Sequence, residues 1–429
     1  MTRRGAGLLL APLVLVLLGA SRSELLGVGL ALFALAAVAV IVDGRRAPGR
    51  DRLRVTREHD AIFSVGRPNV VRLHIEVSGV SAPAIVRDEH PPQMPASVET
   101  IHTKVPAEVE YVITPPARGI REFGHTVVRV TGPWGLGQRQ LRLGEPGPAR
   151  VDPDLSAVQE YEALARRGQL AEMGVRHVRR PGEGTEFERV RDANPDDPLR
   201  AINWKATART GRLMVSELIP ERSQPVIIAL DHGRLMGVGA GALTKLDHSI
   251  NAALLLVNVA LRFGDRAGLL SFDDHVTATL VPRAGRSQLR AFLDVVQPLR
   301  AGSTEADYDE AFAFLSGWQQ RRALVAIFTD VLDPDQGAAL LRQCARLRRR
   351  HLPLVITVRD PALDDAVRQR PADATGVYAR AVAGSVLDDR AATLRMLQLS
   401  GIDTLDADAR SLSPRLVNRY LELKARARL

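Results

Sequence analysis

Residues 226–235 read VIIALDHGRL, five apolar residues followed by the carboxylate of Asp231. An uninterrupted apolar run of this length is typical of a strand that is buried on both faces of a sheet. Three similar runs lie further along the chain, at 267–272, 323–329 and 352–358. Segments with helical patterns separate them, at 246–263, 286–299, 306–319 and 335–350. We therefore predict a Rossmann-like α/β domain over 224–429, with helices on both faces of a mainly parallel sheet.

Three oxygen-bearing side chains fall where such a sheet binds ligands. Ligands of open α/β sheets bind beyond the carboxyl ends of the strands. Asp231 and Asp330 each follow a predicted strand, and Thr304 lies in a connection between two elements. These residues are candidate ligands of a cation. The alternative is that they cap helices and hold loops, which Asp and Thr commonly do.

A highly charged stretch precedes the first strand. Residues 182–222 read GEGTEFERVRDANPDDPLRAINWKATARTGRLMVSELIPER. Apolar residues are spaced among the charges, at Phe187, Val190, Ile202 and Trp204. This mixture is typical of an ordered surface element rather than of a solvated loop or a core helix. We refer to residues 182–222 as the signature segment.

The signature segment resembles the DUF58 family. The shared pattern is GxGxEF, then VR, an Asp-Pro-rich turn, and I(D/N)WKA(S/T)AR. Three positions depart from it: Ala193 stands where an aromatic is usual, Asp196 where Gly is usual, and Asn203 where Asp is usual. The resemblance implies a degenerate domain of the von Willebrand factor A (vWA) type. It also implies a MoxR-type AAA+ ATPase as partner, in cell-envelope or protein-maturation processes.

The resemblance further implies a vestigial metal site. In vWA domains an Asp-x-Ser-x-Ser element, a Thr and an Asp hold Mg²⁺, which prefers octahedral oxygen ligands. Here Gly233 and Leu235 replace both serines, so Asp231, Thr304 and Asp330 remain. Three of five ligands are too few, and Arg234 adds a positive charge. We expect no cofactor; a protein that binds ligands through a divalent cation is the alternative.

The region from 44 to 150 has a different period. Apolar and polar residues alternate at 70–77 and 126–131, which is typical of half-buried strands. Turn-forming residues recur at 66–69, 115–119 and 132–137. This pattern predicts a small antiparallel β-sandwich over 44–150, followed by a connector and the signature segment over 151–223. The turns at 118–119 and 133–136 also resemble those of the DUF58 family.

Two apolar runs, 5–20 and 25–42, open the chain. Each is close to the lower limit for spanning a hydrocarbon core of ~30 Å. A signal peptide is the competing interpretation, but a second run only four residues later favours a transmembrane hairpin over 1–43. Arginines precede the first run and follow the second. The positive-inside rule then predicts a two-pass protein of the cell membrane, with both termini and the soluble domains in the cytoplasm.

The composition limits the classes of partner. The chain has 429 residues, a net charge of +9 and 4% aromatic residues. Scarce aromatics disfavour single-stranded nucleic acid, which binds by stacking. An anionic surface, nucleic acid or lipid, remains an alternative for the arginines of the helix at 335–350, namely Arg342, Arg346, Arg348, Arg349 and Arg350.

Catalytic patterns are weak in this sequence. Asp273, Asp274 and His275 are adjacent, but neighbours at a strand end are expected to point apart. Cys344 lies on an apolar helix, where a buried thiol is expected. None of the four lysines follows a glycine, so the chain has no Walker A motif. We predict that the protein is not an enzyme.

The leading hypothesis is a membrane-anchored interaction protein that works with the MoxR-type ATPase and other membrane proteins. Trp and Arg dominate binding energy at protein interfaces. The candidate contact residues in the signature segment are Glu186, Arg191, Arg200, Trp204, Lys205 and Arg209. Alternatively, Trp204 packs the segment onto the sheet, and Arg191 pairs internally with Glu186 or Asp197.

Overall fold

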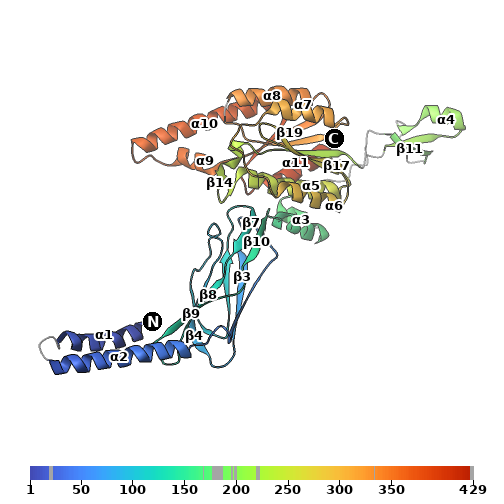
Figure 1. The fold of residues 1–429 in the computed structure, drawn as a ribbon. Helices are drawn as coiled ribbons and strands as arrows, with labels where there is room; N and C mark the ends of the chain where they lie inside the picture. Colours follow the sequence, from blue (N-terminus) through green and yellow to red (C-terminus); the bar gives the residue numbers. More distant parts are fainter. Residues whose placement is uncertain are drawn as a thin grey trace. The chain divides into compact units, whose positions relative to one another are not determined.

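The computed structural model describes residues 1–18, 23–167, 169–175, 187–194, 197, 201–218, 223–332 and 334–425. It divides into two compact units, Met1–Asp152 and Pro153–Leu429. Figure 1 shows the elements of each unit in sequence colours. Glu186 and Arg200 of the predicted contact set lie outside the described residues.

Two apolar helices begin the first unit. Helix α1 (Arg3–Leu18) and helix α2 (Ser23–Arg46) lie side by side (Figure 1). Among the described residues, one helical segment, Leu26–Arg46, is long and apolar enough to cross a membrane. The sequence predicted two membrane-spanning helices, and one of them meets the criteria of length and apolar composition. With 16 residues, α1 is about 24 Å long, shorter than a hydrocarbon core of ~30 Å.

The rest of the first unit consists of strands in three sheets. Their orders are β1-β3-β6, β2-β10-β7 and β5-β4-β8-β9, and all pairs are antiparallel except β2 with β10. The strands are β1 (Leu53–His59), β2 (Ile62–Ser64), β3 (Asn69–Val77), β4 (Ala82–Asp88), β5 (Ile101–Val105), β6 (Ala107–Ile113), β7 (Gly119–Phe123), β8 (Thr126–Thr131), β9 (Gln138–Leu143) and β10 (Gly147–Asp152).

A buried carboxylate joins two of these sheets. Asp88, at the end of β4, accepts hydrogen bonds from Arg57 of β1 at 2.5 and 2.9 Å and from Tyr111 of β6. It also accepts one from Thr126 of β8, 2.8 Å away. A buried carboxylate is stable only when its oxygens are paired with donors. The side chains of Arg57, Tyr111 and Thr126 supply these donors. The hydrogen bonds of Asp88 therefore link the β5-β4-β8-β9 sheet to the β1-β3-β6 sheet through the core between them.

The second unit contains a six-stranded sheet. Its order is β17-β16-β13-β18-β19-β20, and only the edge strand β17 is antiparallel. The strands are β13 (Pro225–Asp231), β16 (Arg266–Phe272), β17 (Val276–Arg283), β18 (Leu324–Phe328), β19 (Leu352–Val358) and β20 (Asp403–Ala407). The predicted α/β class with a mainly parallel sheet is confirmed. The chain order reverses at β13, so its carboxyl end beside β18 is the switch point where such sheets bind ligands.

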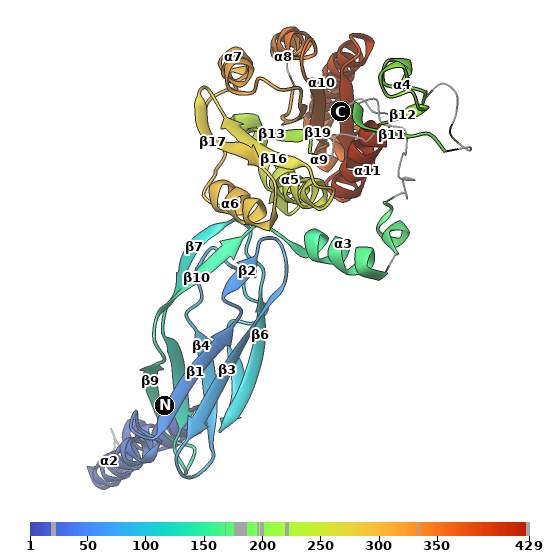
Figure 2. The ribbon, with the colours of Figure 1, turned by 90° about the vertical axis from the view of Figure 1, so that its right-hand side faces the viewer.

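Helices cover both faces of this sheet (Figure 2). Side chains of a strand point alternately to opposite faces. Ile228 and Leu230 of β13 pack in one apolar cluster with α5, α6 and α11, whereas Ile227 and Ala229 pack in the other with α7 and α8. The helices are α3 (Ser156–Arg167), α5 (Lys245–Arg262), α6 (Arg286–Val296), α7 (Tyr308–Trp318), α8 (Pro334–Leu347), α9 (Pro361–Arg368), α10 (Ala374–Leu399) and α11 (Leu412–Ala425).

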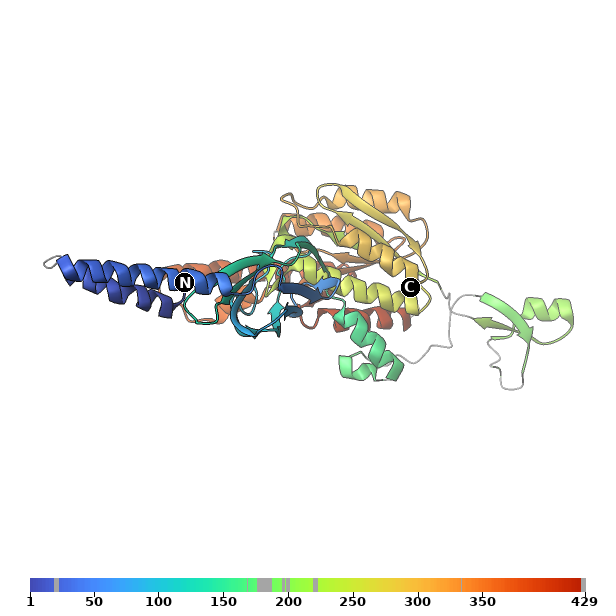
Figure 3. The same cartoon turned by 60° about the horizontal axis from the view of Figure 1, so that its bottom comes forward.

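Short elements complete the second unit. The 3-10 turns η2 (Leu170–Met173) and η4 (Arg234–Gly237) and the paired strands β14 (Gly239–Ala240) and β15 (Leu243–Thr244) lie in connections. The described part of the signature segment forms strand β11 (Phe187–Asp192), helix α4 (Trp204–Thr210) and strand β12 (Met214–Leu218). The two strands pair antiparallel, and α4 lies beside them (light green in Figure 3).

Candidate functional site

Asp231 lies at the switch point and is buried. Its carboxylate accepts a hydrogen bond from the Thr329 hydroxyl at 2.6 Å and one from the Gly233 backbone N–H at 2.7 Å. The Thr329 hydroxyl also contacts the Tyr308 hydroxyl, 2.8 Å away. Burial raises the pKa of Asp231 to about 7, because loss of hydration disfavours the charged form. The two hydrogen bonds oppose this rise without cancelling it.

Asp330, at the end of the neighbouring strand β18, is paired with two cations of the protein itself. The Lys245 ammonium lies 2.5 Å from Oδ2, and the Arg390 guanidinium binds Oδ1. Lys245 is 1% exposed and Asp330 fully buried. Arg390 also binds Asp406 on β20 at 2.9 Å. Both oxygens of Asp330 are thus engaged by side chains that carry positive charge.

Helix α5 places Lys245 at this point. The helix begins with a capping box, in which the Thr244 side chain accepts from the Asp247 backbone N–H and the Asp247 carboxylate accepts from Thr244. Such a box fixes the first turn of the helix. Lys245 is the first residue of that turn, so its ammonium is directed at the strand ends. Nothing in the sequence pattern singled out Lys245 or Arg390 as partners of Asp330.

The third predicted ligand, Thr304, is placed differently. Its side chain is exposed, while its carbonyl accepts the Arg234 backbone N–H at 2.8 Å. Gly233 lies so close that a Cβ there would be 3.0 Å from the Thr304 carbonyl oxygen. Arg234 forms an ion pair with Glu305. The fold therefore brings Asp231 and Asp330 to adjacent strand ends, with the Thr304 backbone beside them.

This arrangement does not fit a magnesium ion. Mg²⁺ is held in proteins by carboxylates and retains several waters. Here the Lys245 ammonium and the Arg390 guanidinium already neutralise Asp330, and burial raises the pKa of Asp231 so that it binds a proton near neutral pH. The positive charge beside Asp330 therefore comes from side chains of the protein itself.

In the turn between β16 and β17, three side chains lie closer together than the sequence predicted. Asp273, Asp274 and His275 were expected to point apart, yet a ligand atom from each lies within 4.8 Å of the others. The three residues form the tight connection of a hairpin, in which the Asp273 backbone N–H binds the His275 carbonyl. Side chains alternate along an extended strand but can converge in a turn, which explains the difference.

The signature segment is held by local hydrogen bonds. Arg191 binds Asp197 through two nitrogens, each 2.7 Å from a carboxylate oxygen, as one of the internal alternatives predicted. The hydrogen bond from Arg191 is the main cause that lowers the pKa of Asp197 to about 2. Asn203 caps α4, since its side-chain oxygen accepts the Ala206 N–H at 2.9 Å. Its amide also donates to Ser216 at 3.0 Å, which an Asp at this position could not do.

Five residues in or just after helix α4 are exposed, and three of them are basic. The Trp204 side chain is 68% exposed, which disagrees with the alternative that it packs the segment onto the sheet. Lys205 and Arg209 are exposed on the same short helix, one turn apart. Arg212 and Leu213, just after the helix, are exposed as well. We call this set the signature face: Trp204, Lys205, Arg209, Arg212 and Leu213.

In the first unit, one turn connects the strands to both apolar helices. The Asp43 carboxylate of α2 accepts the backbone N–H groups of Trp134, Leu136 and Gly137, each at 2.7 Å. The Thr2 hydroxyl, at the start of α1, donates to the Gly135 carbonyl at 2.6 Å. Gly137 is required, because a Cβ there would lie 2.4 Å from the backbone of α2. The turn at 133–137 thus fixes the two helices to the β8–β9 hairpin.

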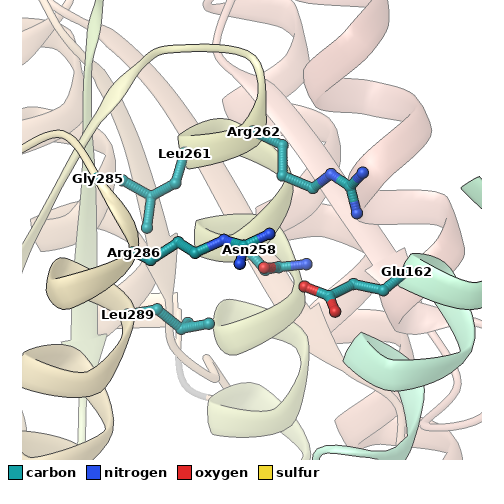
Figure 4. A pocket seen from close by; sticks show the side chains of 7 residues that line it. All are labelled: Glu162, Asn258, Leu261, Arg262, Gly285, Arg286 and Leu289. Carbon is teal, nitrogen blue, oxygen red and sulfur yellow. The ribbon is translucent and has the colours of Figure 1, made fainter. Parts of the chain in front are cut away.

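A small cavity of about 260 Å³ lies between α3, α5 and α6 (Figure 4). Its lining combines two arginines, a glutamate, a buried amide and apolar carbons: Glu162, Asn258, Leu261, Arg262, Gly285, Arg286 and Leu289. The end of α5 immediately precedes β16, so this cavity lies at the amino end of the parallel strands. Ligands of such sheets bind at the opposite edge.

Comparisons with known proteins agree with the signature. Residues 189–367, from β11 to α9, match the model of a family described as protein of unknown function DUF58. Uncharacterized proteins of Mycobacterium tuberculosis (strain H37Rv) and Mycobacterium bovis are 27% identical to this chain over 216 residues. The match covers 49% of this chain and 67% of each relative.

The similarity of this chain to solved structures is weak. The conserved hypothetical protein BatB from Bacteroides thetaiotaomicron is 13% identical with a TM-score of 0.31, over 47% of this chain and 99% of that one. An uncharacterized membrane spanning protein from Vibrio fischeri is 14% identical with a TM-score of 0.17, over 48% and 98%. TM-scores this low carry no argument about function.

Proposed function

We propose that this protein is a membrane-anchored, non-enzymatic interaction protein whose signature face binds a protein partner. The observation that carries the proposal is Trp204, a large aromatic side chain that is 68% exposed among basic residues. An exposed tryptophan that does not contribute to a core is a typical anchor of a protein interface. In keeping with the DUF58 resemblance, we propose a MoxR-type AAA+ ATPase as the partner and a degenerate vWA-like role for the α/β unit.

The charge of the signature face specifies the chemistry of the partner surface. Lys205, Arg209 and Arg212 are exposed and lie close in sequence to the exposed Trp204 and Leu213. The partner surface should therefore be acidic, with an apolar pocket for the indole. Complementary charge accelerates association and selects the partner, while the buried aromatic supplies most of the affinity.

Anchoring is supported by the apolar helices. The apolar side chains of α1 and α2 are largely exposed, for example Leu17 and Leu35, as expected for helices that contact lipid. The bonds from Thr2 and Asp43 to the turn at 133–137 make both helices part of the folded unit, which argues against a cleaved signal peptide. We propose that both helices insert as a hairpin, with the soluble units in the cytoplasm.

The test is capture of the MoxR-type ATPase from the same organism by the full chain in detergent. Trp204→Ala and Arg209→Glu should each abolish capture, while the variants remain folded because both side chains are exposed. Tyr378→Ala and Arg380→Glu are matched controls, because they alter an exposed aromatic and an exposed arginine on α10. If the signature variants capture the ATPase as well as the controls do, the proposed interface is wrong.

A further inference from the structure

The cavity between α3, α5 and α6 contains a buried donor without a partner. Asn258 of α5 lines this cavity and is only 5% exposed. Its side-chain Nδ2 is buried and has no hydrogen-bond partner in the described part of the chain. Buried polar atoms are nearly always paired in folded proteins, so an unpaired one calls for an explanation. A ligand in the cavity with an acceptor oxygen would supply the missing partner.

Two positive charges share the cavity with this donor. Arg262, at the end of α5, and Arg286, at the start of α6, both line it. Figure 4 shows the Arg286 guanidinium directed at the Asn258 amide. Within the described residues, neither arginine forms an ion pair with the third charged side chain of the cavity, Glu162 of α3. Both guanidinium groups can therefore donate hydrogen bonds to an oxyanion.

The start of helix α6 adds backbone donors. Gly285 is the N-cap residue of α6, lines the cavity and has no side chain that could cap the helix. Its φ of 97° lies in the left-handed region, which favours glycine. The first N–H groups of a helix have no partner within the helix, and together with the helix dipole they attract anions. The positive end of this 11-residue helix thus lies at the cavity that holds the unpaired amide.

Glu162 limits which anion the cavity can hold. Its carboxylate points toward the Asn258 amide from α3 (Figure 4). A carboxylate accepts hydrogen bonds and repels a fully ionised anion. Inorganic phosphate keeps at least one hydrogen at neutral pH and can donate it to Glu162, whereas sulfate has none to donate. The cavity of about 260 Å³ is also smaller than the ~300–1,000 Å³ of sites for drug-sized ligands, so it suits a small ion.

We propose that this cavity is a binding site for inorganic phosphate. Arg262, Arg286, Asn258 and the first N–H groups of α6 donate hydrogen bonds to the phosphate oxygens, and Glu162 accepts the remaining hydrogen of the ion. The site lies at the amino edge of the sheet, where α5 ends and α6 begins. It is therefore separate from the carboxylates at the strand ends, and it does not depend on the proposed partner.

The test is phosphate binding by the full chain in detergent, in a phosphate-free buffer of low ionic strength at neutral pH. Equilibrium dialysis against radiolabelled phosphate should find one ion per chain. Sulfate should compete at least about 10-fold more weakly, because it cannot donate to Glu162. Glycerol phosphate tests whether the ion is free or carried by a metabolite: a phosphomonoester loses its last hydrogen near pH ~6, so it should also compete more weakly. Absence of stoichiometric phosphate overturns the proposal, and so does equal competition by sulfate or glycerol phosphate.

Two variants and a matched control complete the test. Arg286→Gln removes a charged donor and should weaken phosphate binding by about 10–100-fold, as loss of a hydrogen bond to a charged group does. Glu162→Gln replaces the acceptor with an amide that can donate, so sulfate should then bind as tightly as phosphate. The control is Arg290→Gln, because Arg290 is also exposed, lies one turn later on α6 and is not among the residues that line the cavity. Equal loss in the two arginine variants would contradict the site, and so would continued exclusion of sulfate by Glu162→Gln.

Discussion

The strand-end site and the signature face use charge in opposite ways. At the ends of β13 and β18, Asp330 is fully buried and paired with Lys245 and Arg390. On the signature face, Lys205 and Arg209 are exposed beside an exposed Trp204. A buried charge is stable only when a partner is fixed beside it, whereas an exposed charge remains hydrated and can bind another molecule. Of these two sites, the first stabilises the fold and the second is available for recognition.

The largest effect should follow from removing the buried ammonium. Lys245→Met leaves Asp330 with one partner instead of two in a dry site. Breaking a buried ion pair costs about 3–5 kcal/mol of stability. Urea denaturation of the detergent-solubilised chain measures this loss. Lys424→Met, which removes a partly exposed ammonium from Asp265, is the comparison and should cost less. Equal losses of stability in both variants would show that the burial of Lys245 does not determine how much its ion pair stabilises the fold.

The second effect concerns pH. The pKa of Asp231 is raised to about 7 in the fold from its ordinary 3.8. Between these values the folded state holds a proton that the unfolded state has released. The contribution of Asp231 to stability is therefore complete below pH 3.8 and is lost as the pH rises through about 7.

Asp231→Asn removes this dependence. Relative to the variant, the wild type should lose about 1.4 kcal/mol of unfolding free energy per pH unit between pH 5 and 7. Denaturation curves of both proteins at several pH values measure the difference in slope. Parallel slopes would mean that Asp231 is already ionised in the fold.

On the signature face, a substitution should weaken binding of the partner but leave the stability of the protein almost unchanged. Trp204→Ala should weaken binding to the ATPase by about 2 kcal/mol or more, as loss of an interface anchor does. Because Trp204 is 68% exposed, the free energy of unfolding should change by less than about 0.5 kcal/mol. Calorimetric titration and urea denaturation measure the two quantities. A large loss of stability would place Trp204 in a core and remove the contrast with Lys245.

The smallest effect concerns the cap of α4. Asn203→Ala removes the acceptor for the Ala206 N–H and should destabilise this helix by about 1 kcal/mol. Asn203→Asp keeps the acceptor but loses the donor to Ser216. Hydrogen exchange at Ala206 should therefore be fastest in the Ala variant and intermediate in the Asp variant. Unchanged exchange in both would contradict the capping role.

Particular residues show how far sequence reasoning reached. The apolar run 226–230 predicted β13, because a strand covered on both faces has no position that favours a polar residue. The edge strand β20, with the sequence DTLDA, lacks such a run and was not predicted. The charge pattern of the signature segment predicted a surface element. It did not predict which of its side chains are exposed, because burial depends on tertiary packing. The structure shows that Trp204 is exposed.

The sequence by itself determined the alternation of strands and helices, the apolar N-terminal segments and the candidate carboxylates at strand ends. These features follow from local periodicity and from the order of elements along the chain. Only the tertiary structure decided which charges meet. Lys245 and Arg390 are 85 and 60 residues from Asp330 in sequence, and His232, which follows β13, lies near Asp273, which follows β16. Pairings over such separations depend on strand order and on the direction of each side chain, which no local pattern records.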